Sequence, residues 1–215
     1  MKKIYKIPAL LFLGMALATV RAADPATQKV GFYTFFNAVG TSTPTNLEIG
    51  KDKVKPDGFN MGDMTGGIGI SAGSHVFTAK NATAKHEDVA VEIKPDASTV
   101  LVAYLISGEE KPKIRFFTAP AAVAASVDQI TVSVVYVSGR PGLDVEINGS
   151  VQHLNALDLV PVPVPKGAVV IKHHADTIGS YGIDGSGSYL VIIFDDEKGD
   201  LASKLVPWTL YQKSK

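Results

Sequence analysis

The chain contains no cysteine in its 215 residues. Disulfides and thiolate chemistry are therefore excluded, and the core must be large enough to hold the fold without covalent staples. Histidine is also scarce: five residues, with no His-x-His or His-x-x-x-His spacing, so the local pattern of a zinc site is missing. The basic residues are dispersed, and this argues against a nucleic-acid partner, which needs a clustered basic surface.

Long apolar runs are missing after the N-terminus. No stretch beyond residue 22 approaches the 18 apolar residues that a membrane-spanning helix needs. Residues 1–22 combine a basic head, a short apolar centre and the small residues Val20 and Ala22 before the expected cut, which predicts a cleavable signal peptide. The alternative, an uncleaved anchor, is disfavoured by the short apolar centre. Loss of this segment leaves 17 basic against 21 acidic side chains, so the mature chain is mildly acidic. We expect an exported protein that is periplasmic, on the cell surface or secreted.

The apolar residues that are present recur with a period of two. Alternating or short β-branched runs, bounded by Gly, Pro, Asp and Ser, predict β-strands; the clearest are at 30–36, 89–93, 100–106, 132–136 and 189–194. One segment, 120–126, has a composition compatible with a short helix, and its place between two strand-rich blocks predicts a linker. The sequence therefore predicts an all-β chain.

Five segments of the first block match five of the second in the same order. Gly40 aligns with Gly139, Leu101 with Leu190, and Phe117 with Trp208. We therefore predict two copies of one domain, that is, two tandem immunoglobulin-like or transthyretin-like antiparallel β-sandwiches. The predicted division is a signal peptide (1–22), domain 1 (23–118), a linker (119–128) and domain 2 (129–215).

Prolines and glycines add local predictions. Pro161, Pro163 and Pro165 share one face of a strand, and since proline lacks the ladder donor, this strand is predicted to lie at a sheet edge. Gly73 and Gly167 are predicted to form the turns that feed the next strand, because glycine adopts positive φ without steric cost.

The segments Phe36–Ala38, Ser71–Phe77, Ser98–Val102 and Leu143–Gly149 follow strand patterns of a bacterial family, the domain of unknown function numbered 4397. The chain resembles two divergent copies of that domain. The resemblance implies an exported β-sandwich and implies no catalytic residues.

Two sets of side chains are candidates for binding a metal. His173 and His174 are adjacent, but neighbours on a strand point to opposite faces, so chelation needs a bulge or help from Asp176 or Asp184. Asp195 and Asp196 begin an acid-rich turn that is either a solvated hairpin loop or a Ca²⁺ site, and its spacing is not that of an EF-hand. No cofactor is predicted.

Four aromatic side chains are candidates for a flat platform that binds a sugar: Phe59, Tyr181, Trp208 and Tyr211. Each is either exposed, as such a platform requires, or part of the core. No Gly-x-Ser-x-Gly elbow stands between a strand and a helix, and no catalytic residue is predicted.

Three functions stay open. The first is a non-enzymatic envelope or extracellular module that contacts other envelope proteins, a surface polymer or its own copies. The second is a carbohydrate- or small-ligand-binding module, assisted by Ca²⁺. The third is an enzyme or metal site that the sequence does not reveal.

Overall fold

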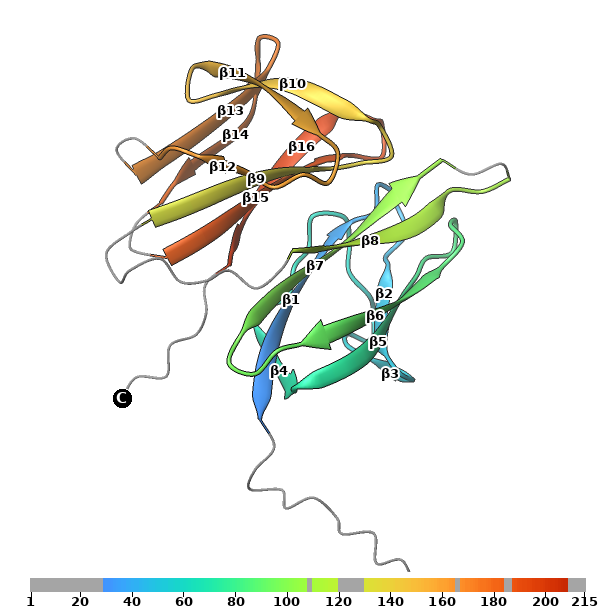
Figure 1. Cartoon of the computed structure of the whole chain (residues 1–215). Helices are drawn as coiled ribbons and strands as arrows, with labels where there is room; N and C mark the ends of the chain where they lie inside the picture. Colours follow the sequence, from blue (N-terminus) through green and yellow to red (C-terminus); the bar gives the residue numbers. More distant parts are fainter. Residues whose placement is uncertain (1–28, 108–109, 120–129, 165–166, 184–186, 209–215) are drawn as a thin grey trace, which may run out of the picture.

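The computed structural model describes residues 29–107, 110–119, 130–164, 167–183 and 187–208 (Figure 1). These form sixteen β-strands in four four-stranded sheets, two sheets to each domain, which confirms an all-β chain of two tandem β-sandwiches. The predicted signal peptide and nearly all of the predicted linker lie outside the described residues. Within the described part of the chain, no helix is long and apolar enough to cross a membrane.

Each domain contributes eight strands. Domain 1 contains β1 (Val30–Ala38), β2 (Asn46–Ile49), β3 (Asp52–Lys53), β4 (Ile68–Ser71), β5 (Gly73–Lys80), β6 (Glu87–Ile93), β7 (Ser98–Ile106) and β8 (Lys113–Ala119). Domain 2 contains β9 (Ile130–Val137), β10 (Gly142–Ile147), β11 (Ser150–Asn155), β12 (Val160–Val162), β13 (Ala168–His173), β14 (Asp176–Gly182), β15 (Gly187–Asp195) and β16 (Leu201–Pro207).

The two domains have the same topology. Domain 1 pairs sheet β4-β1-β7-β8 with sheet β3-β2-β5-β6, and domain 2 pairs β12-β9-β15-β16 with β11-β10-β13-β14. In each domain the first strand pairs in parallel with the long apolar strand, β1 with β7 and β9 with β15, while the other ladders are antiparallel. The structure thus adds one parallel pair to each predicted antiparallel sandwich.

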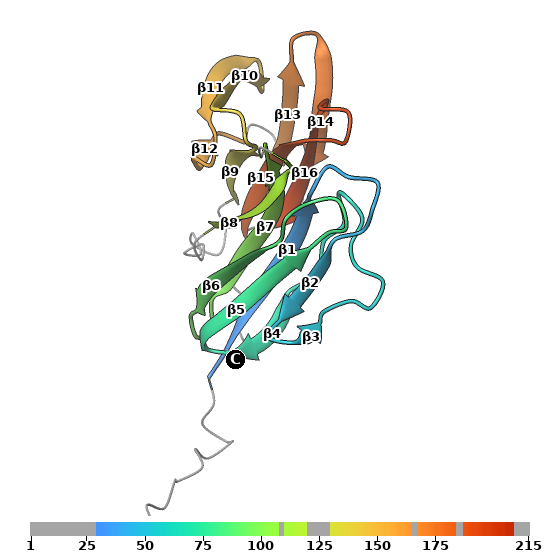
Figure 2. The ribbon, with the colours of Figure 1, turned by 90° about the vertical axis from the view of Figure 1, so that its right-hand side faces the viewer.

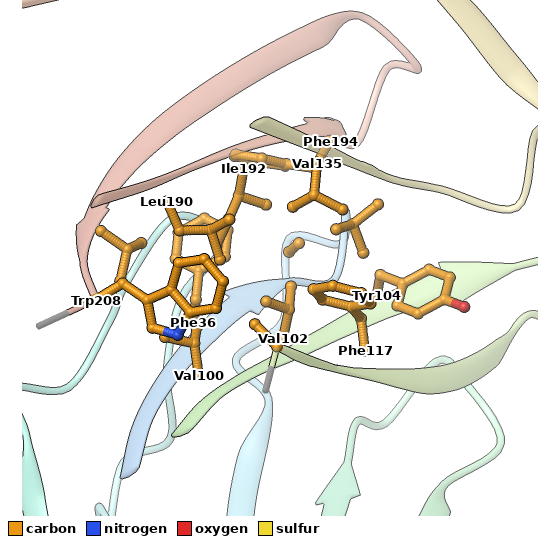
Figure 3. Packing of buried hydrophobic residues seen from close by; sticks show 14 residues of the cluster. Phe36, Val100, Val102, Tyr104, Phe117, Val135, Leu190, Ile192, Phe194 and Trp208 are labelled. Atoms are coloured by element: carbon orange, nitrogen blue, oxygen red, sulfur yellow. The ribbon is translucent and has the colours of Figure 1, made fainter. Parts of the chain in front are cut away.

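The two domains share a hydrophobic core that the sequence analysis did not predict. Sheet β4-β1-β7-β8 packs against sheet β12-β9-β15-β16, and seven buried side chains from each domain meet between them (Figure 3). The rings of Phe36 and Phe194 make an edge contact across this interface, with centroids 5.2 Å apart. Together with the separate core of each domain, this makes a stack of four sheets around three apolar layers.

Alternation along the central strands explains how both faces are filled. On β7, Leu101 and Ala103 face the core of domain 1, while Val100, Val102 and Tyr104 face the shared core. A sheet that is covered on both faces needs apolar residues at every position, which is the reason for the uninterrupted apolar runs of β7 and β15.

The strand registers correct one part of the repeat alignment. Phe36 lies opposite Val102, and Val135, which corresponds to Phe36, lies opposite Ile192. The counterpart of Val102 is therefore Ile192, so Leu101 corresponds to Val191 and not to Leu190. The one-residue shift changes the face of the sheet: Leu101 lies in the core of domain 1, whereas Leu190 lies in the shared core.

The local prediction for proline is confirmed in part: β12, which carries Pro161, lies at the edge of its sheet, whereas Pro163 follows the strand and Pro165 lies outside the described residues. The predictions for the two glycines are confirmed. Gly73 and Gly167 have φ of 132° and 67°. The hairpin between β10 and β11 closes through Asn148 and Gly149, both with positive φ, which is the geometry of a tight two-residue turn.

Candidate functional site

A groove opens at one end of the shared core, where β1 and β9 both end. Its volume is about 290 Å³, and it is bordered by the last residues of β7 and β15 and by the start of the segment that follows β9. In Figure 2 the second domain lies above the first, and the residues that line the groove come from both domains. The groove therefore lies between the domains.

Two glycines allow the domains to approach at this end. A Cβ on Gly40 would lie 2.8 Å from the carbonyl oxygen of Asp196, and a Cβ on Gly139 would lie 3.1 Å from the Cα of Ile106. Gly40 and Gly139 are repeat counterparts, and Ile106 corresponds to Asp196 in the corrected alignment. The two contacts are thus equivalent, and the interface has approximate two-fold symmetry.

The side chains that line the groove break this symmetry. Leu105 and Ile106 at the end of β7 correspond to Asp195 and Asp196 at the end of β15, and both pairs border the groove. One wall is apolar and the facing wall is acidic.

Asp195 is held by a network within domain 2. Its carboxylate accepts hydrogen bonds from the hydroxyls of Ser138 and Tyr136 and lies 3.4 Å from Nη2 of Arg140. Burial raises the pKa of Tyr136, so its hydroxyl keeps its proton and donates it to this network. Arg140 also donates to the carbonyl of Gly199 at 3.0 Å, which ties the segment after β9 to the hairpin between β15 and β16.

Asp196 closes that hairpin. Its Oδ1 accepts the backbone N–H groups of Lys198 and Asp200 at 2.8 and 2.9 Å, a local cap of the kind that Asp forms in turns. The acid-rich segment is therefore a hairpin loop, and its first two carboxylates already accept hydrogen bonds from the chain. Among the described residues, no three His, Asp or Glu side chains are grouped so that they could hold a metal ion.

The histidine pair lies at and just beyond the end of β13, in the outer sheet of domain 2, and does not border the groove. β13 ends at His173, and His174 is in the turn with φ of 54°, so the expectation that the two rings point to opposite faces is wrong. The ring centroids are 4.0 Å apart. Nδ1 of His173 lies 3.1 Å from the carbonyl oxygen of Asp144, whose carboxylate lies 2.7 Å from Nδ1 of His153. Asp176 lies opposite His173 in the ladder, and Asp184 lies outside the described residues.

The candidate sugar-binding aromatics do not form a platform. Phe59 is 4% exposed in the core of domain 1, and Trp208 is 7% exposed in the shared core, which contradicts an exposed role for either ring. Tyr181 is half-buried, and its hydroxyl hydrogen-bonds with Ser203 at 2.7 Å. Tyr211 lies outside the described residues.

The predicted match of Trp208 with Phe117 is also wrong in register. Phe117 pairs with Val102, whose counterpart Ile192 pairs with Lys204. Lys204 therefore corresponds to Phe117. Trp208 lies two residues beyond the counterpart of Ala119, although both aromatic rings pack in the shared core.

Comparison with known proteins does not assign the chain to a family. The chain matches no protein-family model, and no curated protein sequence matches it significantly.

A second hollow of about 210 Å³ lies beside the start of β7, next to the glycine-rich segment that precedes β4. Its border includes Thr34, Met64, Ser98 and Pro207. None of the described residues that border it is charged, so the groove with Asp195, Asp196 and Arg140 is the stronger candidate site.

Proposed function

We propose that this chain is a non-enzymatic, exported structural or interaction module of the cell envelope or the extracellular space. The observation that carries the proposal is the shared core. From the seven buried side chains that each sandwich contributes, we infer that the two move as one rigid body rather than as two domains on a tether. Rigid β-sandwich bodies suit a protein that presents surfaces and loops at fixed positions.

The remaining support comes from the sequence. The predicted signal peptide supports export. From the resemblance of the strand patterns we also propose that the chain belongs to the bacterial family of the domain of unknown function numbered 4397. The partners proposed are other envelope proteins, a surface polymer or further copies of the chain. Because the central sheets are covered on both faces, contacts are left to the outer sheets, the free strand edges and the loops.

Expression of the full chain in a bacterial host tests the export step. We expect the protein in the periplasmic or extracellular fraction with Ala23 as its first residue, measured by fractionation and by mass spectrometry of the intact chain. An Arg21→Glu and Ala22→Glu double variant removes the small residue before the cut and should accumulate uncleaved. Recovery of the wild-type chain in the cytoplasm with Met1 retained would overturn the proposal.

The interaction step is tested separately with the purified mature chain. Sedimentation with isolated envelope material should bring the chain into the pellet in a saturable way, and analytical ultracentrifugation measures self-association. A chain that neither pellets nor self-associates would contradict an interaction role even if it is exported.

The groove favours a second function, the binding of a small ligand. Protein sites for small molecules combine an apolar surface with a few fixed polar groups, and the groove has this composition.

A further inference from the structure

We propose that the groove between the domains binds an amphipathic cation, that is, an ammonium or guanidinium group carried on an apolar stem. The proposal rests on the groove and not on export, so it can fail while the proposed envelope function stands.

The apolar half of the groove provides a surface for the stem. Ala38, Val137 and Tyr104 line it from the shared core, and Ile106 and Pro112 line it from domain 1. Burial raises the pKa of Tyr104, so the apolar half gains no charge at neutral pH. Its volume of about 290 Å³ accommodates a short stem rather than an extended polymer.

The acidic half of the groove carries a net negative charge. Arg140 and Asp195 form an ion pair, so their charges compensate each other. Asp196 has no such partner: its Oδ1 accepts two backbone N–H groups, and its Oδ2 has no hydrogen-bond or ion-pair partner among the described residues. Lys111 and Lys113, which flank Pro112, are exposed and do not border the groove.

The difference between the two domains points to the cation. A carboxylate in a partly covered, partly apolar hollow is stabilised by an opposite charge, and an anionic ligand would meet repulsion from Asp196. The equivalent position in domain 1 is Ile106, which packs on Gly139 and supplies no charge. The groove can therefore orient a ligand with one charged end and one apolar end.

Two sources share this chemistry: a free amine, and a lysine or arginine side chain of a partner polypeptide. The test uses the mature full chain, labelled with ¹⁵N, and four probes: hexylammonium, hexanoate, methylammonium and a blocked tripeptide with a central lysine. We expect saturable amide shifts at Gly40, Gly139 and Asp196 with hexylammonium. We also expect at least tenfold weaker binding of hexanoate, which lacks the cation, and of methylammonium, which lacks the stem.

Asp196→Asn is the decisive variant. Asparagine keeps an Oδ1 that can cap the hairpin, so we expect an unchanged unfolding midpoint and at least a tenfold loss of affinity for hexylammonium. The matched control is Glu197→Gln, which removes the same charge one residue away at an exposed position outside the groove and should change the affinity less than twofold.

Tighter binding of the lysine tripeptide than of hexylammonium would identify a partner polypeptide as the source, and the reverse order would identify a free amine. Equal binding of hexanoate and hexylammonium would overturn the proposal, because the hollow would then select only for apolar surface. The proposal also fails if Glu197→Gln weakens binding as much as Asp196→Asn does, or if no probe gives saturable shifts at the groove.

Discussion

The shared core predicts that damage inside one domain lowers the stability of the whole chain. Phe77 on β5 is fully buried in the core of domain 1, and its ring lies 5.1 Å from the ring of Tyr33 in an edge contact. Phe77→Ala removes this ring from a closely packed site, and such substitutions cost about 3–5 kcal/mol. For a chain of this size that loss lowers the melting temperature by roughly 6–20 °C.

Two probes report on this variant. Trp208 is the single tryptophan and lies in the shared core on the side of domain 2, so its fluorescence follows the interface. Far-UV circular dichroism follows all strands. If the stack is one cooperative unit, both probes should shift to the same lower midpoint in urea, and the calorimetric and van't Hoff enthalpies should agree.

The matched control is Val76→Ala on the same strand. Val76 is 49% exposed on the outer face, so this change should alter stability by no more than about 0.5 kcal/mol. A second circular dichroism transition that keeps the wild-type midpoint in Phe77→Ala would show that domain 2 unfolds alone. The inference of one rigid body would then be refuted.

Three further predictions use the same denaturation assay. Gly40→Ala places a Cβ against the backbone of Asp196 and should cost about 1–3 kcal/mol, whereas Gly182→Ala, which meets nothing within 4 Å, should be near neutral; equal effects would contradict the close approach. Asn148→Ala removes a side chain that accepts a hydrogen bond from the backbone N–H of Val170 and donates one to the carbonyl oxygen of Pro163. This change should lower the free energy of unfolding by about 1–2 kcal/mol, and an unchanged denaturation midpoint would contradict that expectation. Burial raises the pKa of Tyr33 to about 12, so the native state holds this proton more tightly than the unfolded chain, where the pKa is about 10; stability should be full below pH 10 and fall as the pH rises through 12. Tyr33→Phe should show a shallower fall, and an identical slope would argue against this assignment.

Local rules predicted much of the fold because they act over short distances. Period-two runs located most of the strands, and Pro161 placed β12 at an edge because a missing N–H cannot be compensated inside a sheet. The internal sequence repeat predicted that the chain contains two domains of the same kind. The shared core was missed although its evidence is visible in β7: Val100, Val102 and Tyr104 are as apolar as Leu101 and Ala103 on the opposite face, and such a strand is covered twice.

The candidate site was harder to predict because it joins distant segments. The turn at Asp195 and Asp196, for which the sequence left a hairpin loop and a Ca²⁺ site as alternatives, is a hairpin, but Ser138, which hydrogen-bonds to Asp195, is 57 residues away in sequence. No local spacing reveals such a pair. His173 and His174 were assigned to opposite faces because both were placed on a strand, and the turn at His174 removes that alternation.

The unequal ends of β7 and β15 also bear on how the chain assembles in a crowded compartment. Were two copies of domain 2 to associate through the same face, each Gly139 would face Asp196 of the other copy, and the two Asp196 carboxylates, which have no ion-pair partner among the described residues, would share one hollow. Like charges at such short range are unfavourable. In the native pairing the position that faces Gly139 is Ile106, which carries no charge. We therefore expect domain 2 to pair with a domain 1 in preference to a second copy of itself.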